Sequence, residues 1–76
     1  MTEQEWLDEF SSNLVSMLKE ANMSQRELAD DCDLTEASIS NYINARKIPG
    51  IKAMINIAYS LNCSLDELID FGERII

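Results

Sequence analysis

The side chains that most often do chemistry in proteins are scarce in this sequence. Its 76 residues include no histidine, and its two cysteines, Cys32 and Cys63, stand far apart and form no C-x-x-C motif. Lack of histidine removes the commonest general base and the commonest zinc ligand. Each cysteine continues an apolar pattern, so both are predicted to be small core residues rather than a disulfide or a metal pair. We therefore predict that this chain is not an enzyme and holds no metal or cofactor.

The elements that position the remaining polar side chains are all predicted to be helices. Apolar residues recur at steps of three, four and seven over residues 4–21, which predicts an amphipathic helix. Three Ser/Thr-x-x-Glu patterns predict capping boxes at helix starts: Thr2 with Glu5, Ser24 with Glu27, and Ser64 with Glu67. No stretch alternates apolar and polar residues as a strand does. We predict an all-α fold of five helices in a single domain over residues 1–76.

Two of these helices, predicted over 25–32 and 36–43, are short and joined by a tight turn. Thr35 is a suitable N-cap for the second helix. Asp33 and, further along, Asn62 occupy positions where a helix often ends on a left-handed residue, usually Gly. Asp and Asn enter that conformation more easily than other residues with a side chain. The pattern predicts a helix, a turn and a second helix.

The apolar residues of this unit have the spacing that a steep helix crossing requires. A small residue is needed where the axes are closest, and apolar residues must hold the second helix so that its outer face stays exposed. We predict that six residues are buried: Ala29, Leu34, Ile39, Tyr42, Ala58 and Leu61. We predict that four residues are exposed: Glu36, Ala37, Ser38 and Asn41. Trp6 and Phe10 are expected to complete the core.

The segment SQRELADDCDLTEASISNYINARKIPGIKAMINIAYSLNCSLDEL, residues 24–68, resembles the phage repressor and Cro-like (XRE-like) helix-turn-helix family. The Ser-Gln start, the Glu-Leu-Ala run, the Ser-Ile-Ser of the second helix and the Pro after a basic pair occur in family order and spacing. The resemblance implies a lambda-repressor-like domain of five helices. It also implies a sequence-specific DNA-binding transcription regulator, a repressor, that reads the major groove with the helix at about 36–43.

The resemblance also implies roles for individual residues on double-stranded DNA. One set would face base edges in the major groove: Glu36, Ala37, Ser38 and Asn41. A second set would contact the DNA backbone: Gln25, Asn44, Arg46 and Lys47. This sequence departs from the family pattern at the turn, where Asp33 replaces the usual Gly, and at Glu36. A glutamate can accept a hydrogen bond from the amino group of cytosine, but it repels nearby phosphates.

The charge distribution bears directly on DNA binding, because the whole chain carries a net charge of -8. Acidic residues crowd both ends and the first motif helix, but residues 37–65 contain none. That stretch carries Arg46, Lys47 and Lys52. Charges within about 10 Å dominate phosphate contacts at physiological salt. The face around the second motif helix is therefore predicted to accept DNA, although a single copy would bind weakly.

Partners and location follow from the same features. A homodimer through the C-terminal helix is one expectation, because that segment ends on the apolar pair Ile75 and Ile76. The alternative function is an acidic helix-turn-helix interaction module, such as an antirepressor or an antitoxin-like subunit, that binds a basic partner. No apolar run approaches the roughly 18 residues of a membrane span, and the N-terminus is acidic where a secretory signal is basic. We expect a cytoplasmic protein with no membrane contact.

Overall fold

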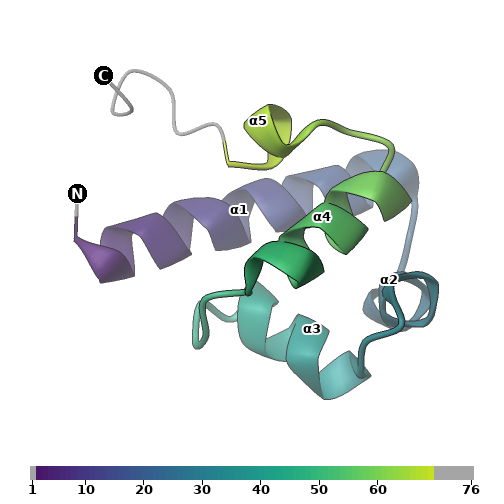
Figure 1. Cartoon of the computed structure of the whole chain (residues 1–76), viewed down its shortest axis with the longest axis horizontal. Helices are drawn as coiled ribbons and strands as arrows, with labels where there is room; N and C mark the ends of the chain where they lie inside the picture. The colour runs from purple at the N-terminus through teal and green to yellow at the C-terminus, as the bar shows by residue number, and fades with distance from the viewer. Residues whose placement is uncertain (1, 70–76) are drawn as a thin grey trace.

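The computed structural model describes residues 2–69, and all regular structure in that range is α-helical. The five helices are α1 (Glu3–Ala21), α2 (Gln25–Cys32), α3 (Glu36–Ile43), α4 (Ile51–Ser60) and α5 (Leu65–Leu68). The long helix α1 runs behind the others (Figure 1), α3 packs on α1 and α2, and α4 packs on α2 and α5. The all-α prediction and the bounds of both motif helices are confirmed.

Side-chain caps start four of the five helices. All three predicted capping boxes form; in the second, the Glu27 N–H donates to Ser24 Oγ over 3.1 Å and the Ser24 N–H donates to Glu27 Oε1 over 3.0 Å. Thr35 caps α3 by accepting from the Ser38 N–H. Helix α4 differs, because its N-cap is Gly50, which offers no side-chain acceptor.

Four of the helix ends are followed by a non-Gly residue in the left-handed conformation, with φ between 54° and 57°: Asn22, Asp33, Ala45 and Asn62. At each of these ends, the N–H of the next residue bonds to a carbonyl five residues back, as Leu34 does to Ala29 over 2.9 Å. The predicted left-handed turns at Asp33 and Asn62 are confirmed. The residue after the turn is apolar and half-buried at three ends, but at the fourth it is the exposed Arg46.

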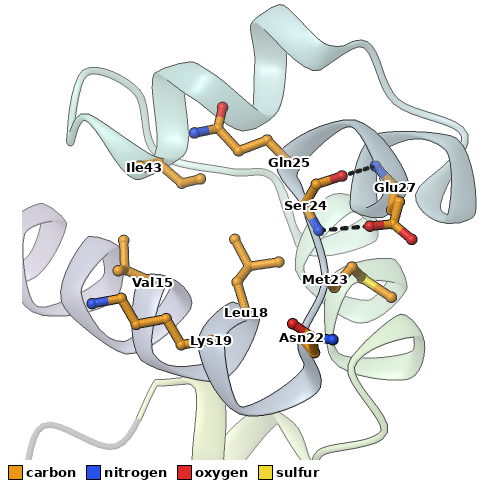
Figure 2. A pocket seen from close by; sticks show the side chains of 9 residues that line it. All are labelled: Val15, Leu18, Lys19, Asn22, Met23, Ser24, Gln25, Glu27 and Ile43. Carbon is orange, nitrogen blue, oxygen red and sulfur yellow. Dashed lines mark hydrogen bonds between the residues drawn. The ribbon is translucent and has the colours of Figure 1, made fainter.

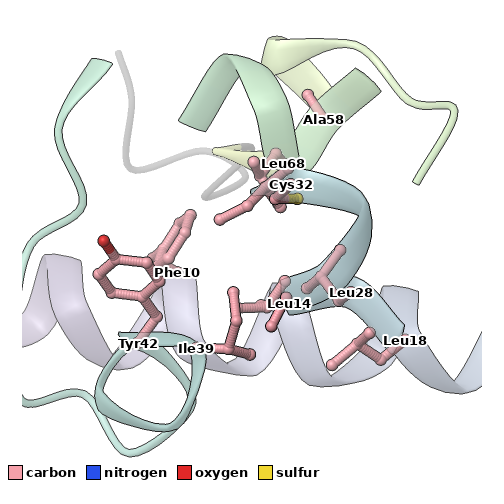
Figure 3. Close-up of a cluster of buried hydrophobic side chains, with 11 residues drawn as sticks. Phe10, Leu14, Leu18, Leu28, Cys32, Ile39, Tyr42, Ala58 and Leu68 are labelled. Atoms are coloured by element: carbon pink, nitrogen blue, oxygen red, sulfur yellow. The ribbon is translucent and has the colours of Figure 1, made fainter. Parts of the chain in front are cut away.

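The hydrophobic core draws side chains from all five helices (Figure 3). Its fully buried members are Phe10, Leu14, Leu28, Ile39, Ile57 and Leu68. Trp6 is half-buried and stacks on Phe10, with ring centroids 5.4 Å apart. The predicted burial of four residues is confirmed: Ala29, Ile39, Tyr42 and Ala58.

Several apolar residues besides Trp6 lie at the edge of the core rather than inside it, and three of them were predicted core residues. Leu34 and Leu61 were predicted to be buried but are half-buried, because each stands at a helix end where packing covers one side only. Cys63 is also half-buried, and its Sγ lies 3.7 Å from Met17 Sδ, whereas Cys32 is inside the core. Both cysteines are free thiols. Burial raises the pKa of each thiol, which favours the protonated and less reactive form.

Candidate nucleic-acid interface

Helix α3 exposes a polar stripe on the side opposite its core contacts. Ile39 and Tyr42 are buried, and at 100° per residue the opposite side carries Ala37, Asn41 and Asn44. Ser40 adjoins this stripe, and Glu36 and Ser38 lie on its two flanks. Glu36 and Ala37 are exposed as predicted.

Two residues of the predicted exposed set are half-buried instead, Ser38 and Asn41. Ser38 lies against its cap, because Thr35 Oγ1 accepts the Ser38 N–H and donates to Ser38 Oγ over 2.9 Å. This arrangement leaves the hydroxyl hydrogen of Ser38 available to an acceptor outside the helix. Asn41 is joined to the loop after α3 through its backbone, since its carbonyl accepts the Arg46 N–H over 2.8 Å.

Asn44 folds its side chain back on α3. Its Nδ2 donates to the carbonyl of Ser40 over 2.9 Å and to Ser40 Oγ over 3.2 Å. The amide nitrogen is thus bonded to Ser40, and Oδ1 is an acceptor that cannot bond to a phosphate oxygen. Ser40 was not among the predicted site residues, although its i,i+4 spacing from Asn44 is the sequence signal for such a contact.

The loop after α3 carries the predicted basic pair. Left-handed Ala45 reverses the chain, and Arg46 and Lys47 follow it with exposed side chains. The buried Pro49 then leads into α4. The first turn of α4 contains no acidic residue. The basic pair is thus held between the last turn of α3 and the start of α4.

Gln25, the first residue of α2, lines a groove of about 660 Å³ between α1, the start of α2 and the end of α3. Figure 2 shows Gln25 and Ile43 on one side of this groove and Val15 and Lys19 on the other. The Gln25 side chain is exposed. The structure therefore brings Gln25 near the end of α3, as a backbone-contacting residue at the start of α2 would require.

Most acidic and most basic side chains around α3 lie on different elements. Acidic side chains lie on α2 and at the start of α3, where Glu36 is exposed. The carboxylate of Glu27 accepts hydrogen bonds from the backbone N–H of Ser24 and, with a smaller effect, from its side chain; these bonds hold the pKa of Glu27 below its ordinary value, so this carboxylate is ionised at neutral pH. The remainder of α3, the loop and α4 contribute no acid and add Arg46, Lys47 and Lys52. Within residues 2–69, no group of three or more metal-ligating side chains gathers, and no helix is long and apolar enough to cross a bilayer.

Comparison with known proteins gives one family match and several similar proteins. The helix-turn-helix family HTH_3 matches residues 14–68. An uncharacterized HTH-type transcriptional regulator of Bacillus subtilis, YqaE, is 33% identical over 60 residues, which are 79% of this chain and 52% of that protein. This chain therefore spans about half the length of that curated relative.

Two solved structures share the fold at low sequence identity. An HTH_3 family transcriptional regulator from Vibrio cholerae superposes with a TM-score of 0.87 at 16% identity, over 97% of this chain and 42% of the other. The SOS-response transcriptional repressor LexA from Eubacterium rectale gives a TM-score of 0.85 at 20% identity, over 96% of this chain and 78% of the other. The arrangement of the five helices is thus common to all three.

Proposed function

This chain belongs to the HTH_3 helix-turn-helix family, a family of DNA-binding transcription regulators, and we propose on that premise that it reads the major groove of DNA with α3. The observation that carries the proposal is the exposed polar stripe of α3 beside a basic loop, in the part of the chain that lacks acidic residues. The loop follows α3 directly, and the Arg46 N–H bonds to the Asn41 carbonyl. DNA recognition needs both kinds of contact, one to base edges and one to phosphates.

The proposed base contacts follow from the chemistry of four side chains. Asn41 can pair with adenine through both its donor and its acceptor. The Ser38 hydroxyl has a free hydrogen for a base acceptor, and the Ala37 methyl can contact the methyl group of thymine. Glu36 accepts from the amino group of cytosine. These residues stand on the first two turns of α3, which is the part of a recognition helix that enters the groove.

The proposed backbone contacts come from the two ends of the helix-turn-helix. Arg46 and Lys47 neutralise phosphates beyond the end of α3, and Gln25 donates its side-chain amide to a phosphate at the start of α2. Asn44 belongs to the same set. The amide nitrogen of Asn44 is bonded to Ser40. Asn44 therefore either replaces one of these hydrogen bonds with a bond to a phosphate oxygen or acts by positioning the end of α3.

We also propose that the protein is a repressor and acts as a dimer on a two-fold operator. A single α3 with one basic pair neutralises few phosphates, so a second copy raises affinity by engaging a second half-site. The expected dimer contact through the C-terminal helix concerns Ile75 and Ile76, which lie outside the described residues. Within α5, Leu68 is fully buried and Leu65 is partly exposed.

Titration against DNA tests the proposal. A duplex selected from a random pool and a scrambled duplex are titrated at two salt concentrations. Arg46→Ala and Lys47→Ala should each weaken binding to both duplexes and lower the salt slope by about one unit. Arg46→Lys keeps the charge and serves as the matched control, with a slope close to wild type. Asn41→Ala should instead change the base preference.

Glu36→Gln tests whether the charge of Glu36 weakens binding to DNA. It removes a charge that faces phosphate and keeps hydrogen bonding, so overall affinity should rise and the preference at one position should shift from cytosine toward adenine. If the folded protein binds neither duplex at low salt, DNA reading is wrong. The alternative is then the acidic interaction module, which the exposed Glu36 and the net charge of -8 favour. That module would bind a basic protein partner and would show no affinity for DNA at any salt concentration.

A further inference from the structure

Helix α4 is apolar on its outer side as well as on its core side. Ile57 and Ala58 face the core, but Ile51 is 76% exposed, Ile55 48% and Tyr59 88%. These three residues are spaced by four and therefore follow one side of the helix. Ile48, in the loop before α4, is 45% exposed. We refer to these four residues as the α4 stripe.

The α4 stripe accounts for nearly all the large apolar side chains that residues 2–69 expose. The one further member of that class is Leu65, on α5. A small monomeric domain has no stability reason to keep two isoleucines and a tyrosine in water on one side of one helix, with a third isoleucine in the loop before it. A contiguous exposed patch of this kind marks a surface that another molecule covers.

The charge distribution indicates which molecule covers the α4 stripe. Two copies with a net charge of -8 repel each other wherever their acidic surfaces meet, and the α4 stripe falls entirely within the acid-free residues 37–65. Asp31 does reach α4 by accepting a hydrogen bond from Ser60 over 3.1 Å. Ser60, however, lies on the flank where α4 packs on α2, well around the helix from Ile55. The segment that carries the stripe thus adds no carboxylate of its own to a contact between two acidic chains.

The same stripe suits a second copy better than a partner selected by charge. Lys52 is the one charged residue on this part of α4, so apolar burial rather than charge pairing has to supply the affinity. A two-fold contact needs a patch that complements itself, and an apolar helix side with rows of similar side chains satisfies that condition. We propose that the α4 stripe is the two-fold contact of a homodimer.

The placement of the stripe fits the dimer assumed in the proposed function. Residues 44–50 connect α3 directly to α4, so a contact through α4 joins two copies close to both recognition helices. The contact itself does not depend on DNA and can be tested in its absence.

Sedimentation equilibrium of the full chain without DNA provides that test. The wild type should show a concentration-dependent monomer and dimer equilibrium. Ile55→Glu and Tyr59→Glu should each raise the dissociation constant at least tenfold, with circular dichroism and melting temperature close to wild type because both side chains are exposed. Leu65→Glu is the matched control, since it changes an exposed apolar residue off the stripe, and it should leave the equilibrium unchanged.

Two results would overturn the proposal. One is a wild type that stays monomeric at every concentration. The other is a dimer that Leu65→Glu dissociates while both α4 variants retain it, which would place the contact at the C-terminal helix. The proposed function is judged separately, by titration with one and with two half-sites. A wild type that dimerises through α4 but binds no DNA keeps the contact and rejects DNA reading. A wild type that binds DNA as a monomer keeps DNA reading and rejects the α4 contact.

Discussion

The hydroxyl group of Ser11, in α1, donates a hydrogen bond to the carbonyl oxygen of Ile43, the last residue of α3. Carbonyls in the last turn of a helix have no partner within the helix, so this bond satisfies one of them inside the protein. Ser11 is also buried, with 9% of its surface exposed, which is unusual for a serine on an amphipathic helix. The bond thus fastens the end of the proposed recognition helix to α1.

Ser11→Ala should lower the free energy of unfolding by about 1–3 kcal/mol, because it leaves the Ile43 carbonyl without its partner in a partly buried place. Ser12→Ala is the matched control. Ser12 is exposed on the same helix, and its replacement should stay within about 0.5 kcal/mol of wild type. Urea denaturation measures both values. Equal stabilities of the two variants would show that the bond contributes nothing to folding.

Ala29→Leu should lower the free energy of unfolding by about 1–3 kcal/mol through overpacking, since Ala29 is 2% exposed on α2, which packs on both α3 and α4. Ala37→Leu makes the same change on the outer side of α3, where the side chain is exposed. It should leave the melting temperature close to wild type. A variant at Ala29 that melts with the wild type would mean that the helices do not approach each other at that residue.

Ala45→Gly should stabilise the protein by up to about 1 kcal/mol. Ala45 has a φ of 56°, which costs a residue with a Cβ atom about 1–2 kcal/mol. Glycine removes that penalty but loses about 0.5–1 kcal/mol more chain entropy on folding. Ala37→Gly, inside α3, is the control and should destabilise by about 1 kcal/mol. Thermal unfolding should show a higher melting temperature for Ala45→Gly and a lower one for Ala37→Gly. A loss of stability in Ala45→Gly would contradict the inference that the left-handed conformation strains Ala45.

Stability should fall in acid through Glu27. Its folded-state pKa lies below the ordinary value of 4.5 because it accepts hydrogen bonds from Ser24, so the folded state favours the ionised form. That contribution is complete above the ordinary pKa and is lost as the pH falls through the lowered pKa. In Glu27→Gln the amide oxygen can still accept from Ser24 but does not titrate. Melting temperatures measured down through this pH window should therefore decline less steeply for Glu27→Gln than for the wild type.

Local signals in the sequence were sufficient for most of the fold. Capping patterns such as Ser24 with Glu27 describe contacts between neighbours, so they identify helix starts without knowledge of the packing. The left-handed turn at Asp33 was equally visible, because Asp is one of the few residues that enter it readily. Ala45 has no such preference, and its conformation is set by the chain reversal between α3 and α4. Its left-handed turn could not be predicted from residue type.

The degree of burial was harder to predict because it depends on which other elements pack against a residue. Leu34 and Leu61 are apolar residues in core spacing, yet each stands where a helix ends and no element covers its outer side. Asn41 is polar and faces outward, yet it is half-buried. Asn44 was assigned to the DNA backbone from the resemblance alone. Its bonds to Ser40 depend on a rotamer that residue type does not specify.

The hydrogen bonds at the end of α3 have a consequence for how the exposed side of this helix would meet a ligand. The Asn44 side chain holds Ser40, the Arg46 N–H holds the Asn41 carbonyl, and α3 packs on both α1 and α2. A helix held in this way has little freedom to tilt or shift its register within the domain. If α3 reads DNA as proposed, a mismatch between its surface and a duplex is then accommodated by bending or twisting of the DNA. Discrimination between operators should therefore extend to base pairs that α3 never touches, because stiff and flexible steps differ in how much free energy that deformation requires.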